Sequence, residues 1–161
     1  MKKNTVNAQR VTPNPELPKA AVGKLIADPI VEKAIRKYLK YVKGVMPTGE
    51  LTKADLDKLP ILHLNGNKLT DVPKGLEKLT QLEVLNLYNN RLTEVPKGLE
   101  KLTRLKQLDL NNNQLTDVKE LEKLTQLKHL YLLRNPDLTK AQIDELKKAL
   151  PNCNISSDPT K

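Results

Sequence analysis

Phenylalanine and tryptophan are absent from this chain of 161 residues, and four tyrosines bring its aromatic fraction to only 2%. A core without those large side chains must be built from medium-sized aliphatic residues, which is unusual for an enclosed enzyme pocket. The single cysteine excludes an internal disulfide framework and a zinc site built from cysteines. No apolar run approaches the roughly 18 residues that a membrane-spanning helix needs, so we expect no transmembrane segment.

Leucine is the residue that the chain has in excess, with 30 copies, about twice the usual share. Of these, 27 lie from residue 51 onward, and such interchangeable aliphatic layers are typical of a solenoid. The formal net charge of +9 is concentrated at the N-terminal end. Residues 1–50 hold ten basic and four acidic residues, whereas residues 51–161 hold 18 basic and 15 acidic residues. The sequence therefore divides into a basic N-terminal part and a leucine-rich body.

An eleven-residue pattern, L-x-x-L-x-L-x-x-N-x-L, recurs in that body. Full copies begin at Leu59, Leu82 and Leu105, 23 residues apart. A fourth begins at Leu127 after 22 residues, keeps the pattern through Asn135 and then gains one residue, so its last leucine is Leu138. Alternation along each copy predicts a short strand whose leucines point inward. Over about residues 59–138, the pattern resembles the leucine-rich repeat family. The 23-residue copies, with their Val-Pro, are similar to the Ras-group or bacterial subtype, and the 22-residue copy to the shorter subtype of internalins.

The resemblance implies an α/β fold, a right-handed solenoid with a curved parallel sheet on its concave face. It also implies that the asparagine of each copy bonds to backbone groups of neighbouring turns, which a sharp buried corner would leave unpaired. Contact with a ligand is the alternative role for these side chains. The predicted asparagine ladder is Asn67, Asn90, Asn113 and Asn135.

Helical caps are expected at both ends, because the end layers of about four repeats would otherwise expose leucine to water. Asp28-Pro29 predicts a helix start and Gly44 its end, and Thr52 with Asp55 predicts a short second helix through a capping box. We expect the first helix to cover the first repeat with Val31, Ile35, Tyr38 and Val42.

The chain is thus expected to comprise a flexible tail (1–27), a helical N-terminal cap (28–58), about four repeats (59–138) and a C-terminal cap (139–161). A capping box at Thr139 predicts the last helix, and residues 151–155 look like the terminating strand of such proteins. No apolar stretch follows the lysines near Met1, so the chain as printed is expected in the cytoplasm. A secreted or cell-surface location is the alternative if a leader was removed.

The outward positions of the predicted strands differ from copy to copy, whereas the opposite side repeats Glu-Lys-Leu-Thr almost verbatim. Diversity confined to one face indicates a binding surface, with drift at tolerant positions as the alternative. Tyrosine and arginine are typical interface anchors. The predicted partner-binding residues are His63, Val84, Asn86, Tyr88, Gln107, Asp109, Asn111, His129, Tyr131, Leu133 and Arg134.

Other chemistries find less support in the sequence. Asp109 and His129 fall on adjacent predicted strands, which permits an acid–imidazole pair, but no nucleophile or phosphate-binding loop accompanies them. His63 and His129 lie about three strands apart, on the order of 14 Å, which argues against zinc. Cys153 is expected to be a small buried residue of the last strand, with a reactive role as the alternative.

We therefore expect a monomeric, non-catalytic protein that binds a protein partner through its concave face and needs no cofactor or metal. The competing hypothesis is electrostatic binding of nucleic acid or anionic membrane through the basic N-terminal part. The charged face of the first helix favours electrostatic binding. A solvated surface of the cap would explain the same charges, however, and the aromatic side chains that would stack on bases are missing. That face comprises Lys33, Arg36, Lys37, Lys40 and Lys43.

Overall fold

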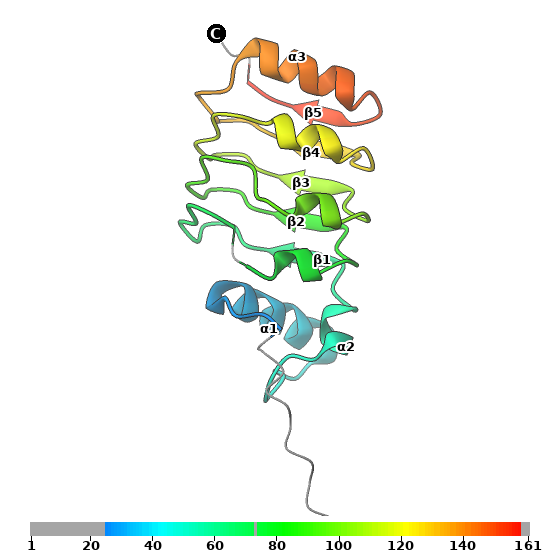
Figure 1. Cartoon of the computed structure of the whole chain (residues 1–161). Helices are drawn as coiled ribbons and strands as arrows, with labels where there is room; N and C mark the ends of the chain where they lie inside the picture. The colour runs from blue at the N-terminus through cyan, green and yellow to red at the C-terminus, as the bar shows by residue number, and fades with distance from the viewer. Residues whose placement is uncertain (1–24, 73, 159–161) are drawn as a thin grey trace, which may run out of the picture.

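Five short parallel strands, stacked in chain order, form the spine of the molecule (Figure 1). The structure is a computed structural model and describes residues 25–72 and 74–158. Each strand is three residues long and pairs with the next in the order β1-β2-β3-β4-β5. The strands are β1 (Ile61–His63), β2 (Val84–Asn86), β3 (Gln107–Asp109), β4 (His129–Tyr131) and β5 (Asn154–Ser156). This arrangement confirms the predicted α/β leucine-rich solenoid.

Short 3-10 helices return the chain from one strand to the next. They are η1 (Leu76–Lys78), η2 (Leu99–Lys101) and η3 (Lys119–Lys123). Gly75 and Gly98 precede η1 and η2 in the left-handed region, with φ of 102° and 88°, where a side chain would be strained. The 22-residue copy has no such glycine, and η3 starts directly after Val118. The one-residue difference in repeat length therefore lies in this return segment.

The leucines of successive copies stack in register to make one continuous core. Leu62 pairs with Leu85, Leu85 with Leu108, and Leu108 with Leu130, and all four are at most 1% exposed. Loss of one such side chain to alanine typically costs about 2–5 kcal/mol. The repeated pattern thus supplies the same buried leucine side chains to each successive layer of the solenoid.

Helix α1 (Pro29–Lys43) closes the N-terminal end beside β1, and the single-turn α2 (Lys53–Leu56) follows it (Figure 1). The predicted helix start is confirmed, since the Asp28 carboxylate accepts from the backbone N–H of Ile30 and Val31. Gly44 ends the helix in the left-handed conformation, and the Thr52–Asp55 capping box is present. The local signals therefore marked the helix ends correctly.

The predicted packing face of α1 is wrong at Val42, which is 59% exposed. Val31 and Ile35 are fully buried as expected, but Leu39 completes the buried stripe, and Tyr38 is only half-buried. A 15-residue helix is about 22 Å long, whereas a three-residue strand spans about 10 Å. The last turn of α1 consequently extends beyond the layer that the helix covers.

Ile26, which falls within the predicted tail, belongs to the core and is 1% exposed. Its side chain lies so close to Gly75 that a Cβ there would meet Ile26 Cδ1 at 3.3 Å. The Leu25 carbonyl accepts from Lys78 Nζ at 2.8 Å, which also joins this segment to η1. The rest of the predicted tail, residues 1–24, lies outside the described residues.

The C-terminal end is closed by α3 (Lys140–Ala149) together with β5. The predicted capping box is present, with the Thr139 hydroxyl accepting from the Gln142 backbone N–H. Strand β5 pairs with β4 in parallel, which confirms the terminating strand. The prediction that Cys153 is a buried residue of the last strand is wrong, because it directly precedes β5 and is half-buried. Desolvation still raises the pKa of its thiol.

Candidate functional site

Three rows of outward residues make up the face that we call the concave face. The first two rows lie on the strands and are fixed by the observed register. The third row lies two residues beyond the second, at the carboxyl ends of the strands. The rows are Ile61, Val84, Gln107 and His129; then His63, Asn86, Asp109 and Tyr131; then Asn65, Tyr88, Asn111 and Leu133.

Apolar and aromatic groups of this face are partly open to solvent. Tyr88 is 39% exposed and Leu133 38%, while Tyr131 is half-buried. His63 and His129 are exposed at opposite ends of the face, on β1 and β4. Tyr88 and Leu133 flank Asn111 in the third row, at about 4.8 Å per strand. The face thus presents a mixed surface of aromatic, amide and imidazole groups.

Several of the polar side chains also hold the backbone at the strand ends. The Asn86 side chain accepts from Tyr88 N–H at 2.9 Å, and the Asp109 carboxylate accepts from Asn111 N–H at 3.0 Å. Asn111 in turn accepts from Leu133 N–H at 2.7 Å. The first two are local Asx-type contacts that could be expected from sequence, whereas the Asn111–Leu133 contact joins neighbouring copies across 22 residues. They give Asn86, Asp109 and Asn111 a positioning role in the third row.

Asp109 is the titratable group whose environment is most perturbed on this face. It is half-buried, and desolvation raises the pKa of its carboxyl group, with the Asn111 N–H opposing that shift. Within residues 25–72 and 74–158, no hydrogen bond joins Asp109 to His129. In register, Asp109 lies opposite Tyr131 and His129 opposite Gln107. Asp109 and His129 thus lie on adjacent strands, as predicted, but they are not hydrogen-bonded to each other as an acid–imidazole pair.

The turns that border the face adopt the left-handed conformation in all four copies. Gly66, Asn89, Asn112 and Arg134 have φ of 69°, 56°, 54° and 58°. Glycine and asparagine tolerate this region, whereas arginine does so at a cost of about 1–2 kcal/mol. The turn therefore explains the first three residue types, whereas Arg134, like Lys68 with φ of 58° in the first copy, adopts this region at that cost. Its backbone N–H donates to the Asp158 carboxylate.

Buried asparagines link neighbouring turns beneath this edge. Asn90 Oδ1 accepts from the backbone N–H of Asn67 and Leu69, and its Nδ2 donates to the carbonyls of Leu64 and Leu87. One and two copies later, Asn113 Oδ1 and Asn135 Oδ1 accept from the backbone N–H of Leu92 and Leu115, and their Nδ2 groups donate to carbonyls as in Asn90. These two asparagines are 4% and 2% exposed.

Asn67 differs from the other three asparagines. It is exposed, and its Nδ2 donates to the Asn65 carbonyl within its own turn. The reason is its place in the stack, because the element before this copy is a helix and not another repeat.

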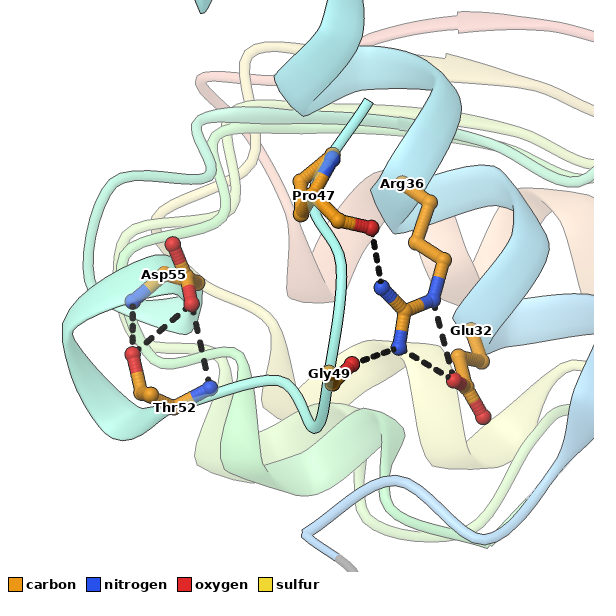
Figure 2. Close-up of polar contacts among 6 residues, drawn as sticks. All are labelled: Glu32, Arg36, Pro47, Gly49, Thr52 and Asp55. Carbon is orange, nitrogen blue, oxygen red and sulfur yellow. Dashed lines mark hydrogen bonds and ion pairs between the residues drawn. The ribbon is translucent and has the colours of Figure 1, made fainter. Parts of the chain in front are cut away.

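The basic face of α1 is partly used inside the N-terminal cap (Figure 2). The Arg36 guanidinium donates to the carbonyls of Pro47 and Gly49, at 2.8 and 2.6 Å, and pairs with the Glu32 carboxylate at 2.7 Å. Arg36 therefore ties α1 to the loop that leads into α2. Sequence reasoning missed this role because the loop carbonyls are 11 and 13 residues away.

Lys43 is also engaged in the cap. It forms a 2.9 Å ion pair with Asp55, and this pair together with the Thr52 contacts lowers the pKa of Asp55 to about 2. Arg36 and Lys43, two of the five basic residues predicted on the charged face of α1, thus form contacts that stabilise the cap. The hypothesis of electrostatic binding consequently loses part of the charge on which it rests.

A family model described as leucine rich repeat matches residues 57–115 and 80–136. The chain is similar to an internalin from Listeria monocytogenes, at 25% identity and a TM-score of 0.66 over 85% of this chain and 45% of that one. A leucine-rich repeat protein from Leptospira interrogans gives 39% identity and a TM-score of 0.57, over 66% of this chain and 28% of that one.

Internalin C2 from Listeria monocytogenes shares the fold, at 23% identity and a TM-score of 0.64, over 85% of this chain and 67% of that one. No curated protein sequence matches. The chain spans less than half the length of the first internalin and of the Leptospira protein.

Two further observations bear on the class of site. In residues 25–72 and 74–158, no helix is long and apolar enough to cross a membrane. The same described residues contain no group of three or more histidine, cysteine, aspartate or glutamate side chains that could hold a metal ion. His63 and His129 lie in different rows and three strands apart.

Proposed function

Because this chain is a leucine-rich repeat protein of the bacterial type, we propose that it is a non-catalytic module that binds a protein partner through its concave face. The repeat architecture by itself favours a general role in protein interaction. The finer proposal is that the contact centres on Tyr88, Asp109, His129, Tyr131, Leu133 and Arg134.

The observation that carries the proposal is the contrast between inward and outward positions. Inward leucines are the same in every copy, whereas the outward rows change from copy to copy and include half-exposed Tyr88 and Leu133. Partly exposed aromatic and apolar groups within a polar rim are the usual composition of a binding hot spot. Arg134 supports the same location, because it is exposed beside Leu133 and arginine is a typical interface anchor.

An open sheet does not favour catalysis, since it excludes little water from a reacting group. Asp109, the group with the raised pKa, already accepts a backbone hydrogen bond that positions the third row. Its half-buried carboxyl group is well placed to accept a hydrogen bond from a partner instead of moving a proton.

The test is affinity capture from the source cell with the wild-type protein and the Tyr88→Ala/Tyr131→Ala variant on parallel columns. A partner that binds the concave face should be retained by the wild type and depleted from the double variant, because two anchors are removed. Glu100→Ala/Lys101→Ala is the matched control, since both residues are exposed on η2. Equal recovery of the same partner from all three columns would refute the placement.

Charge-driven binding is distinguished by salt. Retention through the concave face should persist between about 50 and 200 mM salt, whereas polyelectrolyte binding falls steeply over that range. Truncation is less informative if it reaches α1, because removal of Val31, Ile35 and Leu39 would uncover the first repeat. A shortened chain that lacks residues 1–24 keeps these three side chains and is the suitable truncation.

A further inference from the structure

An open cavity of about 790 Å³ lies between α1 and the concave face at β1. One stripe of α1 forms its helix side, and the outward residues of β1 and the following turn form its sheet side. The lining residues that matter most are Lys33, Lys37, Tyr38 and Tyr41 from the helix, and Ile61 and His63 from the sheet. The proposed partner patch on later strands does not include this cavity.

The length of the cavity suits an extended segment of chain. Lining residues run from Pro29 to Tyr41 on α1, twelve residues along a helix, or about 18 Å. An extended peptide of five or six residues spans the same distance at about 3.3 Å per residue. The stripe lies beside the buried stripe of Val31, Ile35 and Leu39, so packing of α1 on the core holds it in place.

The charge of the lining is of one sign. Lys33 and Lys37 are exposed along the helix side, and none of the described residues that line the cavity is acidic. Arg36 and Lys43, by contrast, are paired with Glu32 and Asp55 inside the cap. The two lining lysines are therefore positioned to meet carboxylates from outside the molecule.

The same cavity also offers apolar surface. Ile30, Ala34 and Ile61 contribute to its lining beside Tyr38. Tyr41, at its end, is 88% exposed, and Val42, Val45 and Met46 beyond it are 59%, 72% and 45% exposed. An exposed apolar surface next to basic groups fits a ligand that carries both carboxylates and apolar side chains.

Two other occupants fit less well. Residues 1–24 of the chain hold five basic residues and one acidic residue, so they would meet the lining lysines with like charge. Nucleic acid needs a basic groove that follows its backbone over several nucleotides. Beyond β1 the second row continues with Asn86 and Asp109, which offers no such groove.

We infer that this cavity is a binding site for an extended acidic segment of a partner protein, with carboxylates on Lys33 and Lys37 and an apolar side chain between Tyr38 and Ile61. The inference rests on the proposed function, because the cavity opens onto the concave face. According to this inference, one part of the proposed protein partner is acidic and extended, and it contacts the N-terminal end of the concave face.

The four tyrosines of the chain make the inference directly measurable. The full chain is labelled with 3-fluorotyrosine, and its four ¹⁹F signals are assigned by single Tyr→Phe substitutions. The probe is a capped Glu-Asp-Leu-Glu-Asp-Leu peptide, compared with a version that has lysine at the acidic positions and with a thymidine hexanucleotide. We expect the acidic peptide to move the Tyr38 and Tyr41 signals in a saturable way that weakens with salt.

Charge reversal tests the two lysines. Lys33→Glu/Lys37→Glu should weaken binding of the acidic peptide by about tenfold or more, since a lost charge-assisted hydrogen bond typically changes affinity by about that factor. Lys147→Glu/Lys148→Glu on α3 gives the same change in net charge on exposed residues at the other end and should leave binding within about twofold. Far-ultraviolet circular dichroism confirms that each variant is folded.

The inference is overturned if the acidic peptide leaves Tyr38 and Tyr41 unmoved, if charge reversal at Lys33 and Lys37 has no effect, or if the hexanucleotide binds as tightly. Movement of Tyr88 and Tyr131 alone would overturn the cavity as the site and would leave concave-face binding supported. Movement of Tyr38 and Tyr41 alone supports the cavity, and the double tyrosine variant still tests the rest of the face separately.

Discussion

The two ends of the solenoid are closed in different ways. At the C-terminal end β5 pairs with β4, so the sheet gains one more strand and its hydrogen bonds hold the cap. At the N-terminal end α1 lies beside β1 and is joined to the following loop by Arg36 and to α2 by the Lys43–Asp55 pair. A strand continues the concave face, whereas a helix does not extend the sheet and leaves a cavity beside the first strand.

The largest expected effect comes from removing one buried side chain at each end. Ile35→Ala and Leu146→Ala each remove a fully buried side chain and should lower the free energy of unfolding by about 2–5 kcal/mol in urea titrations. Ile35→Ala should also shift the Tyr38 and Tyr41 signals, because it loosens the wall of the cavity. A loss below about 1 kcal/mol for Ile35→Ala would show that α1 does not close the first repeat.

A smaller effect is expected from Arg36, whose guanidinium ties α1 to the loop before α2. Arg36→Ala should cost about 1.5–3 kcal/mol of unfolding free energy, because its hydrogen bonds to Glu32, Pro47 and Gly49 involve a charged group. Arg36→Lys should recover little, since an ammonium group cannot reproduce the fork of a guanidinium. Lys40→Ala, an exposed residue of the same helix, is the control and should lie within about 0.5 kcal/mol of wild type.

The smallest predicted effect is a response to acid that separates the two capping boxes. The N-terminal box uses Asp55 and the C-terminal box uses Gln142, which does not titrate. The folded-state pKa of Asp55 is lowered from 3.8 to about 2, so its stabilising contribution is complete above about pH 4. That contribution is lost as the pH falls through 2.

Amide hydrogen exchange, measured from pH 5 to pH 2 and corrected for intrinsic rates, checks this response. Protection in α2 should decrease toward pH 2 relative to protection in the first turn of α3. In an Asp55→Asn variant, the α2 protection should lose this pH dependence. Equal loss of protection at both boxes would contradict the assignment of the effect to Asp55.

The sequence was sufficient for the features that depend on local periodicity. The spacing of Leu59, Leu82 and Leu105 predicted the strands, and Thr139 and Gly44 predicted helix ends. Each of these signals acts within one turn or one repeat. The family match over residues 57–136 covers the same part of the chain.

Features that depend on how α1 meets β1 could not be predicted. Helical periodicity alone placed Val42 on the covering face, but the layer beneath α1 ends before the last turn. Arg36 was assigned to a charged surface because its carbonyl partners lie in a loop without periodic signal. The cavity at Lys33 and Lys37 likewise arises only from the placement of a helix against the end of the sheet.

The most direct test of the central claim is the dissociation constant of a captured partner for the wild type and the Tyr88→Ala/Tyr131→Ala variant. Concave-face binding predicts a loss of at least about 30-fold, the size of one hot-spot residue, with Glu100→Ala/Lys101→Ala within about twofold of wild type. An unchanged dissociation constant in the tyrosine variant, with a large loss in the η2 control, would contradict the claim and assign the partner to the opposite side.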